Sequence, residues 1–411
     1  MHKIERLLQT LAPKGVEFRK LGEVLEYDQP NKYCVTSKDF DESYPTPVLT
    51  AGKTFILGYT NEKDNIYQAS KSSPVIIFDD FTTATQWVDF PFKVKSSAMK
   101  ILLPKNPIIN IRFIFFYMQT IPYNIGGEHA RHWISRYSQL EVPIPPLEIQ
   151  QEIVKILDAF TELNTELNTE LNTELNARKK QYEYYQNMLL DFNDINQSHK
   201  DAKEKLAQKP YPKRLKTLLQ TLAPKGVEFR KLGEVLEYDQ PNKYCVTSKD
   251  FDESYPTPVL TAGKTFILGY TNEKDNIYQA SKSSPVIIFD DFTTATQWVD
   301  FPFKVKSSAM KILLPKNPII NIRFIFFYMQ TIPYNIGGEH ARHWISRYSQ
   351  LEVPIPPLEI QQEIVKILDA FTELNTELNT ELNARKKQYE YYREKLLTFK
   401  PLTLNKEVKK C

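Results

Sequence analysis

The sequence of 411 residues is poor in cysteine and in long apolar runs, and each shortage excludes a class of protein. Its three cysteines, Cys34, Cys245 and Cys411, are too few and too widely spaced for a disulfide framework or a zinc site. They indicate reduced thiols in a cytosolic protein. No apolar run reaches the ~18 residues of a membrane span, and the first residues do not resemble a signal peptide. We therefore expect a cytoplasmic protein that does not enter a membrane.

An excess of charge of one sign is also missing. The chain has 53 Lys and Arg against 50 Asp and Glu, a net charge of +3. Bulk charge therefore neither requires nor excludes nucleic acid, and any basic surface must be local. With 41% hydrophobic and 25% charged residues, the composition is that of a globular chain long enough for about two to three domains.

Motifs for catalysis are absent as well. Ala51-Gly-Lys-Thr54 is similar to the end of a phosphate-binding loop, but the glycine that such a loop needs five residues earlier is Pro47. The sequence has neither the Asn/Asp-Pro-Pro-Tyr/Phe motif of adenine methyltransferases nor a Gly-x-Gly cofactor loop. Asp79 and Asp80 lack the nearby acidic residue and lysine of a nuclease site, and a turn at a strand end explains them. We expect no catalytic residue and no cofactor on this chain.

The dominant feature that is present is a repeat. Residues Leu7–Asn172 recur letter for letter as Leu218–Asn383, at an offset of 211. The copies then differ by one four-residue unit: Thr-Glu-Leu-Asn occurs four times in Thr161–Asn176 and three times in Thr372–Asn383. A period this long indicates a duplicated domain. Two identical modules suit a target that is itself two-fold symmetric, such as duplex DNA with an inverted repeat. A gene duplication without a symmetric target is the alternative.

Each module has a simple predicted order of elements. β-Forming runs between polar turns predict a strand-rich part over 17–103. The unbroken apolar run 110–120 predicts a buried helix, and a loop follows at 123–138. The Pro-rich stretch 142–146 ends the module and opens a long helix over 147–192.

The long helix needs a partner. Its apolar residues from Ile149 to Phe160 lie at helical spacing, and the leucines of the Thr-Glu-Leu-Asn units continue this stripe with a drift of ~40° per unit. A helix of roughly 65–70 Å buries such a stripe only against another element, and the second copy supplies one at 358–397. We predict an antiparallel coiled coil, because two-fold packing places one module at each end. A low-complexity linker is the alternative for the four-residue units.

Two segments resemble the specificity subunits of type I restriction–modification systems. Leu140–Phe160 (LEVPIPPLEIQQEIVKILDAF) is similar to the segment that closes each recognition domain in that family, and Gly15–Val24 (GVEFRKLGEV) resembles the entry to the domain. The Thr-Glu-Leu-Asn units resemble the helix repeats whose number sets the half-site spacing in some of these systems. With the two-copy layout, the resemblance covers nearly the whole chain. This sequence departs from the usual pattern of the family in one respect. Most such subunits carry two different recognition domains, and here the two are identical.

The resemblance implies a role in double-stranded DNA recognition. Each module would read about three to five base pairs of one half-site. The helices would form a spacer and a docking surface for two methyltransferase subunits, which would supply S-adenosylmethionine and adenine N6 methylation. Motor–nuclease subunits would complete the restriction complex. Identical modules add the expectation of a bipartite palindrome whose spacer is set by helix length. The alternative is a coiled-coil scaffold whose duplicated domains bind protein.

The predicted fold class is α+β: two β-rich mixed α/β recognition domains, related by pseudo-two-fold symmetry and separated by a long antiparallel coiled coil. We expect the tail to fray after Pro401. The expected parts are an N-terminal helix (1–14), a first recognition domain (15–146), a spacer helix with four Thr-Glu-Leu-Asn units (147–195), a linker (196–217), a second recognition domain (218–357), a spacer helix with three units (358–397) and a C-terminal tail (398–411).

Candidate DNA contacts rest on side-chain chemistry and loop placement, because recognition domains of the family differ in the residues that read bases. The segment His129–Arg136 (HARHWISR) offers imidazoles, guanidiniums and a hydroxyl, while two histidines without a third ligand do not indicate a metal site. Lys93 and Lys95 alternate on an expected strand, so both should face DNA phosphates, with a solvated face as the alternative. The nominated residues are Lys53, Thr54, Thr82, Thr83, Lys93, Lys95, His129, Arg131, His132 and Arg136 in the first copy and Lys264, Thr265, Thr293, Thr294, Lys304, Lys306, His340, Arg342, His343 and Arg347 in the second.

Overall fold

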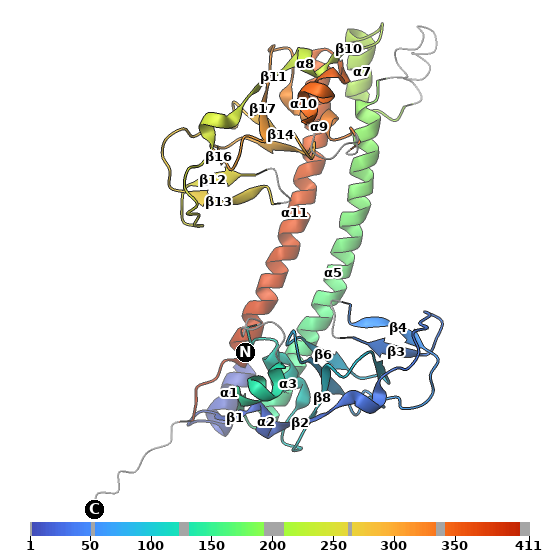
Figure 1. Ribbon diagram of the computed structural model, residues 1–411, viewed down its shortest axis with the longest axis vertical. Coiled ribbons are helices and arrows are strands. Elements are labelled where there is room, and N and C mark those ends of the chain that lie inside the picture. Colours follow the sequence, from blue (N-terminus) through green and yellow to red (C-terminus); the bar gives the residue numbers. More distant parts are fainter. Residues whose placement is uncertain are drawn as a thin grey trace, which may run out of the picture. The chain divides into compact units, whose positions relative to one another are not determined.

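The computed structural model describes residues 2–50, 54–122, 131–192, 209–261, 265–333 and 342–402. The chain divides into two compact units. The first unit combines Met1–Glu170 with Glu381–Cys411, and the second is Leu171–Thr380. Each unit therefore holds one module and a part of both long helices, α5 (Leu147–Leu190) and α11 (Leu358–Leu397) (Figure 1).

The two modules have the same succession of elements. The first contains α1 (His2–Leu11), β1 (Glu17–Lys20), α2 (Leu21–Val24), β2 (Leu25–Asp28), η1 (Pro30–Tyr33), β3 (Thr46–Leu49), β4 (Ile56–Thr60), β5 (Val75–Asp79), β6 (Thr85–Val88), β7 (Lys93–Val94), β8 (Met99–Pro104), α3 (Ile111–Met118), α4 (His132–Ser135), η2 (Tyr137–Gln139) and β9 (Glu141–Ile144). The second contains α7 (Lys213–Leu222), β10 (Glu228–Lys231), α8 (Leu232–Val235), β11 (Leu236–Asp239), η4 (Pro241–Tyr244), β12 (Thr257–Leu260), β13 (Ile267–Thr271), β14 (Val286–Asp290), β15 (Thr296–Val299), β16 (Lys304–Val305), β17 (Met310–Pro315), α9 (Ile322–Met329), α10 (His343–Ser346), η5 (Tyr348–Gln350) and β18 (Glu352–Ile355).

Each module contains three small sheets. One is the antiparallel pair β1-β9, with β10-β18 as its counterpart in the second module. The four-stranded sheet has the order β2-β8-β5-β6 with antiparallel pairing, and the three-stranded sheet has the order β4-β3-β7. In the latter, β3 pairs antiparallel with β4 and parallel with β7. The corresponding orders in the second module are β11-β17-β14-β15 and β13-β12-β16.

Strand β5 separates two hydrophobic cores. Val75 and Ile77 belong to the core shared with the three-stranded sheet, whereas Ile76 and Phe78 belong to the core that contains α3 and the start of α5. Successive side chains of a strand point to opposite faces, so a strand covered on both faces must be apolar throughout. The run Val-Ile-Ile-Phe satisfies this requirement, and all of β5 is buried.

The run predicted to be a buried helix is α3, so this prediction is confirmed. Asn110 caps the helix: its side-chain oxygen accepts hydrogen bonds from the backbone N–H groups of Arg112 and Phe113, at 3.0 and 3.2 Å. Gln150, fully buried near the start of α5, accepts from the Asn110 N–H at 2.8 Å and donates to the Pro145 carbonyl at 2.7 Å. The first turns of α5 are thus fastened to the module that precedes them.

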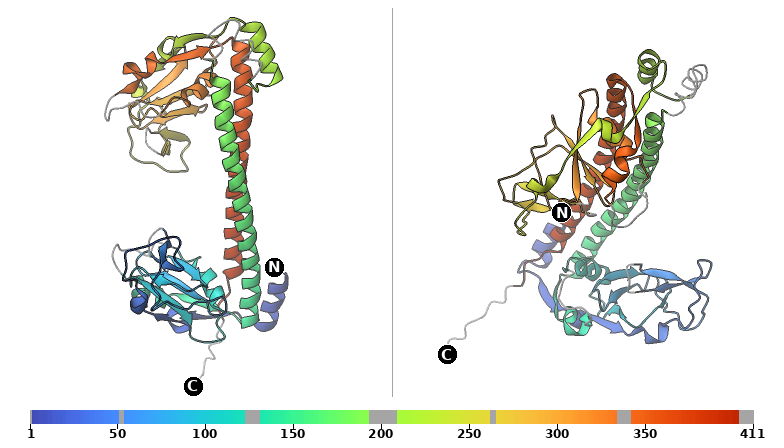
Figure 2. Two further views of the ribbon diagram at one scale, coloured as in Figure 1. Left: turned by 90° about the vertical axis from the view of Figure 1, so that its right-hand side faces the viewer. Right: turned by 45° about the horizontal axis from the view of Figure 1, so that its top comes forward.

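Inside the first unit, the start of α5 lies beside the end of α11, and the two run in opposite directions (Figure 2). The Phe160 ring stacks on Tyr392 with centroids 5.6 Å apart. Earlier in α5, Leu157 shares a core with Leu396, later in α11. Residues later in α5 therefore contact residues earlier in α11. This confirms the predicted antiparallel pairing within this unit.

The leucines of the Thr-Glu-Leu-Asn units are not equally buried. Leu175 is 7% exposed, but Leu163 is 52% exposed. The drift of ~40° per four-residue step rotates the stripe away from a straight contact line, so only part of it can be covered. Threonine is tolerated in these helices because its hydroxyl donates to the carbonyl four residues earlier, as Thr165 does to Thr161 at 2.7 Å.

A short C-terminal segment completes the first unit beyond α11. The Val16 N–H donates to the Lys400 carbonyl and the Leu402 N–H donates to the Val16 carbonyl, both at 2.9 Å. The expectation of a tail frayed after Pro401 is therefore wrong for Leu402, while residues 403–411 lie outside the described part. Gly15 has a φ of +107°, and a Cβ there would lie 2.5 Å from the Pro401 carbonyl oxygen, so only glycine permits this approach.

Candidate nucleic-acid interface

Four segments far apart in the sequence meet at one edge of each module through backbone hydrogen bonds. The Lys95 N–H donates to the Leu49 carbonyl at 2.8 Å, where the β3–β4 turn begins. The Asp80 N–H donates to the Ala98 carbonyl at 3.0 Å, and the His132 N–H donates to the Asp80 carbonyl at 2.8 Å. We call the joined segments the loop edge: the described residues of the β3–β4 turn (50, 54 and 55), the β5–β6 turn (80–84), the β7–β8 turn (95–98) and 131–136, with counterparts at 261, 265 and 266, at 291–295, at 306–309 and at 342–347.

Asp80 is the residue on which the loop edge is assembled. It is 1% exposed, and its carboxylate accepts the Trp133 N–H at 2.7 Å while lying 3.5 Å from the Lys100 ammonium. Helix α4 has no side-chain cap of its own at Arg131, so Asp80 satisfies its first N–H groups from another element. Lys100 also donates to the Gln29 side chain. A buried ion pair offsets its desolvation only with such additional hydrogen bonds.

The β5–β6 turn is held in a strained conformation. Asp79 accepts the Phe81 N–H at 2.9 Å through one carboxylate oxygen and the Thr82 hydroxyl through the other. Thr83 has a φ of 62°, which is unfavourable for a β-branched residue. Its hydroxyl is buried without a hydrogen-bond partner. Strain of this kind persists only where surrounding bonds over-determine it, and it is frequent at functional sites.

The structure divides the nominated residues into three groups. Those at least partly exposed on the loop edge are Thr54, Thr82, Lys95, Arg131 and Arg136, with Thr265, Thr293, Lys306, Arg342 and Arg347 in the second copy. Those buried are Thr83, Lys93 and His132, with Thr294, Lys304 and His343. Those outside the described residues are Lys53, His129, Lys264 and His340.

The expectation that Lys93 and Lys95 share one face is wrong. Strand β7 ends at Val94; Lys93 is buried, whereas Lys95 is exposed with its ammonium 5.3 Å from the centroid of the Phe40 ring. Alternation predicts a shared face only on a strand that continues through both residues. Lys93 therefore serves the interior of the module, and Lys95 faces solvent.

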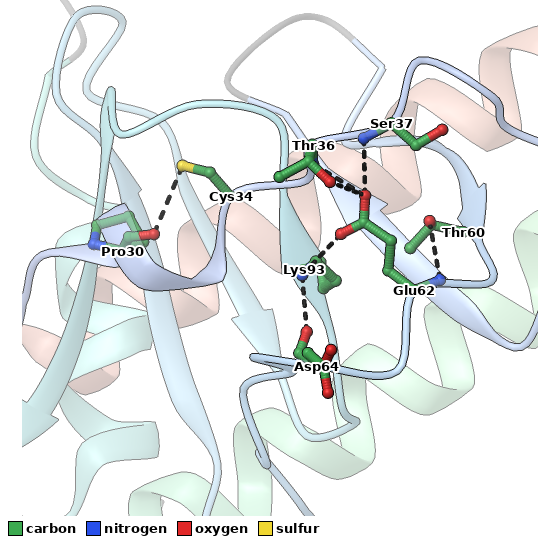
Figure 3. A network of polar contacts seen from close by, with 8 residues as sticks. All are labelled: Pro30, Cys34, Thr36, Ser37, Thr60, Glu62, Asp64 and Lys93. Atoms are coloured by element: carbon green, nitrogen blue, oxygen red, sulfur yellow. Dashed lines mark hydrogen bonds and ion pairs between the residues drawn. The ribbon is translucent and has the colours of Figure 1, made fainter.

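Lys93 is engaged in a polar network (Figure 3). Its ammonium lies 2.9 Å from the Glu62 carboxylate and donates to the Asp64 carbonyl at 2.8 Å. The other Glu62 oxygen accepts the N–H groups of Thr36 and Ser37, at 2.9 and 2.7 Å, and the Thr36 hydroxyl. Burial alone would raise the pKa of Glu62, but the bonds from Ser37, Lys93 and Thr36 outweigh it and lower the pKa to about 2.

We expect Glu62→Gln together with Glu273→Gln to destabilise the chain at pH 7 by about 2 kcal/mol per module, because each change leaves a buried lysine without its carboxylate. The folded-state pKa of Glu62 lies below its ordinary value of 4.5, so its contribution is complete above pH 4.5 and is lost as the pH falls towards about 2. Urea midpoints at pH 7 and pH 3 measure both effects. The wild type should lose more stability across this interval than the double variant, with Glu26→Gln, at an exposed site, as control. Equal losses would contradict the assignment.

The described residues contain no group of three or more His, Cys, Asp or Glu that could hold a metal ion. Cys34 and Cys245 are free thiols, and burial raises the pKa of each. No helix in the described ranges is long and apolar enough to span a membrane. Among its described residues, the loop edge presents the exposed side chains of Thr54, Lys95, Arg131 and Arg136.

Comparison with known proteins gives one consistent result. The family model described as "Type I restriction modification DNA specificity domain" matches residues 13–177 and again 224–386. The specificity subunit of the type I restriction enzyme EcoR124I/EcoR124II of Escherichia coli is 37% identical, over 98% of this chain and 99% of its own. A putative type I specificity subunit of Haemophilus influenzae, S.HindORF215P, is 29% identical over 96% of this chain and 98% of its own.

A solved structure shares the fold. The type I restriction–modification S subunit of M. genitalium matches with a TM-score of 0.56 at 14% identity, over 93% of this chain and 96% of that one. At this identity the match bears on the fold alone. It agrees with the mixed α/β modules and long helices described above. With two matches to the family model, the chain belongs to the specificity subunits of type I restriction–modification systems, which determine the DNA sequence that is recognised.

Proposed function

We propose that the chain directs methyltransferase subunits to a bipartite DNA site whose two halves are the same short word in inverted orientation. The observation that carries this proposal is the identity of the modules: Leu7–Asn172 equals Leu218–Asn383. Both loop edges are assembled with the same bonds, as His132 to Asp80 and His343 to Asp291 illustrate. Two identical readers related by a two-fold axis select two identical words.

The proposed recognition domains are 15–146 and 218–357, and the proposed spacers are the helices within 147–195 and 358–397. On each domain, the loop edge would contact DNA. The cations of Lys95, Arg131 and Arg136 would hold phosphates or read guanine, and the Thr54 hydroxyl would hold phosphate. Lys53 and His129 belong to the same proposed surface by their positions in the sequence.

The number of Thr-Glu-Leu-Asn units would set the distance between the half-sites. One unit adds ~6 Å and ~40° to a helix. One base pair adds ~3.4 Å and ~34–36° to the duplex. Because the rotations nearly match, we infer that one unit corresponds to about one base pair of spacer. Two base pairs, which are nearer to the rise of ~6 Å, are the alternative.

The chain would work with partners and without chemistry of its own. The relatives are named as specificity subunits of type I restriction enzymes. For this chain we propose two methyltransferase subunits, which bring S-adenosylmethionine and methylate adenine N6, and motor–nuclease subunits that complete a restriction complex.

Methylation mapping of the host genome, with and without the gene, tests the proposal directly. We expect modified adenines in two identical words of inverted orientation with a fixed number of bases between them, and their disappearance when the gene is deleted. Deletion of an unrelated gene is the control. A motif with two unrelated halves would contradict the palindrome.

A binding measurement separates this function from a protein-binding scaffold. With the methyltransferase subunits present, a duplex carrying the mapped motif should bind with an affinity that falls as salt rises, at a log–log slope of about −0.9 per phosphate contacted. A scaffold would show no such binding.

A further inference from the structure

Phe81 and Phe292 occupy the tips of the β5–β6 turn and its counterpart in the second module. Each of these residues is 44% exposed. Single exposed apolar residues are ordinary on protein surfaces. These two differ because the turn beneath them is strained and fixed at several points. We propose that Phe81 and Phe292 are specificity-determining residues, each contacting the 5-methyl group of a thymine in its half-site. This inference rests on the proposed function.

The backbone around Phe81 has little freedom to withdraw the ring. Asp79 binds the Phe81 N–H, and Asp80 is tied to Ala98 on one side and to His132 on the other. The Thr83 N–H donates to the Asp79 carbonyl at 2.9 Å, which closes the turn. The left-handed backbone of Thr83 is part of this fixed turn. A fixed turn holds the Phe81 ring in one position, as recognition of a base requires.

Cationic groups lie on the two segments that are bonded to Asp80, the first residue of the turn. The segment that begins with Lys95 is joined to Asp80 through Ala98, and the segment with Arg131 and Arg136 is joined through His132. All three cationic side chains are exposed. Lysine and arginine near the turn can contact backbone phosphates while Phe81 at its tip meets the bases.

The chemistry of the tip favours a thymine methyl. The Thr82 hydroxyl, next to Phe81, donates to Asp79 and is occupied within the turn. The phenylalanine ring therefore offers an apolar contact, and the thymine methyl is the apolar group displayed in the major groove. A wedge inserted between base pairs must project from its surface, whereas Phe81 as a residue is more than half covered. Contact with a base edge fits this partial cover better.

The test uses the full chain with its methyltransferase subunits and a pool of duplexes with randomised bases. Wild type should select thymine at one position of each half-site, and Phe81→Ala with Phe292→Ala should lose that preference while keeping the others. Replacing the selected thymine by uracil removes only the methyl group. It should weaken wild-type binding about fourfold per half-site, the factor for burying one methyl, and leave the double variant unchanged.

Two further variants separate recognition from stability. Phe81→Leu with Phe292→Leu keeps an apolar tip and should retain part of the thymine preference with an unchanged melting temperature. Ile108→Ala with Ile319→Ala removes side chains of similar exposure, 46%, beyond the opposite end of the sheet, and should alter no base preference. The inference is overturned if uracil weakens wild type and double variant equally, or if the selected bases do not change. A wild type that selects no bases would instead contradict the proposed function.

Discussion

Removal of one Thr-Glu-Leu-Asn unit from α5 is expected to abolish methylation at the natural site and to create methylation at a site whose spacer is about one base pair shorter. The deletion of Thr173–Asn176 leaves three units in each helix and shortens α5 by one step of ~6 Å and ~40°. The modules are untouched, so the half-site words should stay the same. Single-molecule methylation mapping of cells that carry the variant measures both changes.

The size of this effect follows from the number of base contacts at risk. A register error of one base pair displaces one module by ~3.4 Å and ~34–36° from its word. Each lost base pair costs ~1–3 kcal/mol, so losing a half-site of about three to five base pairs weakens binding at least a hundredfold. An unchanged spacer length would contradict the proposal that the number of Thr-Glu-Leu-Asn units sets the distance between the half-sites.

A matched variant isolates length from sequence. Replacing Thr173–Asn176 by Ala-Glu-Leu-Ala keeps the leucine and the helix length but removes the repeat. Its methylation motif should equal that of the wild type. A shifted motif here would mean that the side chains of the unit, and not its length, set the spacing.

Asp80→Ala is expected to be the most damaging single substitution in the first module. It leaves Lys100, 2% exposed, without its carboxylate and the Trp133 N–H without an acceptor. Breaking a buried ion pair from one side costs about 3–5 kcal/mol. Because the same residue joins the β5–β6 turn to α4, site-specific DNA binding should be lost together with stability.

The duplicated chain supplies internal controls for this prediction. Asp291→Ala makes the same change in the second module, where Asp291 lies 3.4 Å from Lys311, and should reproduce the loss in urea midpoint. Asp80→Asn retains an acceptor for the Trp133 N–H, so its urea midpoint should lie between those of the wild type and Asp80→Ala. Glu42→Ala, at an exposed carboxylate, should change little. A negligible effect of Asp80→Ala would contradict the role assigned to the loop edge.

Local sequence patterns were enough to predict those elements in which successive residues all favour the same secondary structure. The apolar run of α3 is longer than a strand and unbroken, and the stripe from Ile149 to Phe160 repeats at helical spacing. The offset of 211 showed the two modules directly. In these cases a few neighbouring side chains decide the structure, and no distant partner has to be known.

The sequence predicted separate segments of the loop edge but not that they lie together. Its segments are joined by bonds such as that between His132 and Asp80, 52 positions apart, and no periodic pattern reports such pairs. Lysine is rarely buried, so the sequence gives no reason to place Lys93 or Lys100 in the interior. Each is buried because a carboxylate, Glu62 or Asp80, accompanies it. Pairing of this kind becomes visible only when the fold brings the partners together.

The hydrogen bonds of Val16 with Lys400 and Leu402 join residues that are synthesised at very different times. The second unit is continuous, Leu171–Thr380, so all of it is synthesised before the residues of α11 that belong to the first unit. The first unit begins at Met1 but includes Glu381–Cys411. Although it is begun first, its core and the hydrogen bonds of Val16 stay incomplete until residues 396–402 are made. The first module therefore depends on residues 396–402, made long after it, to complete its fold.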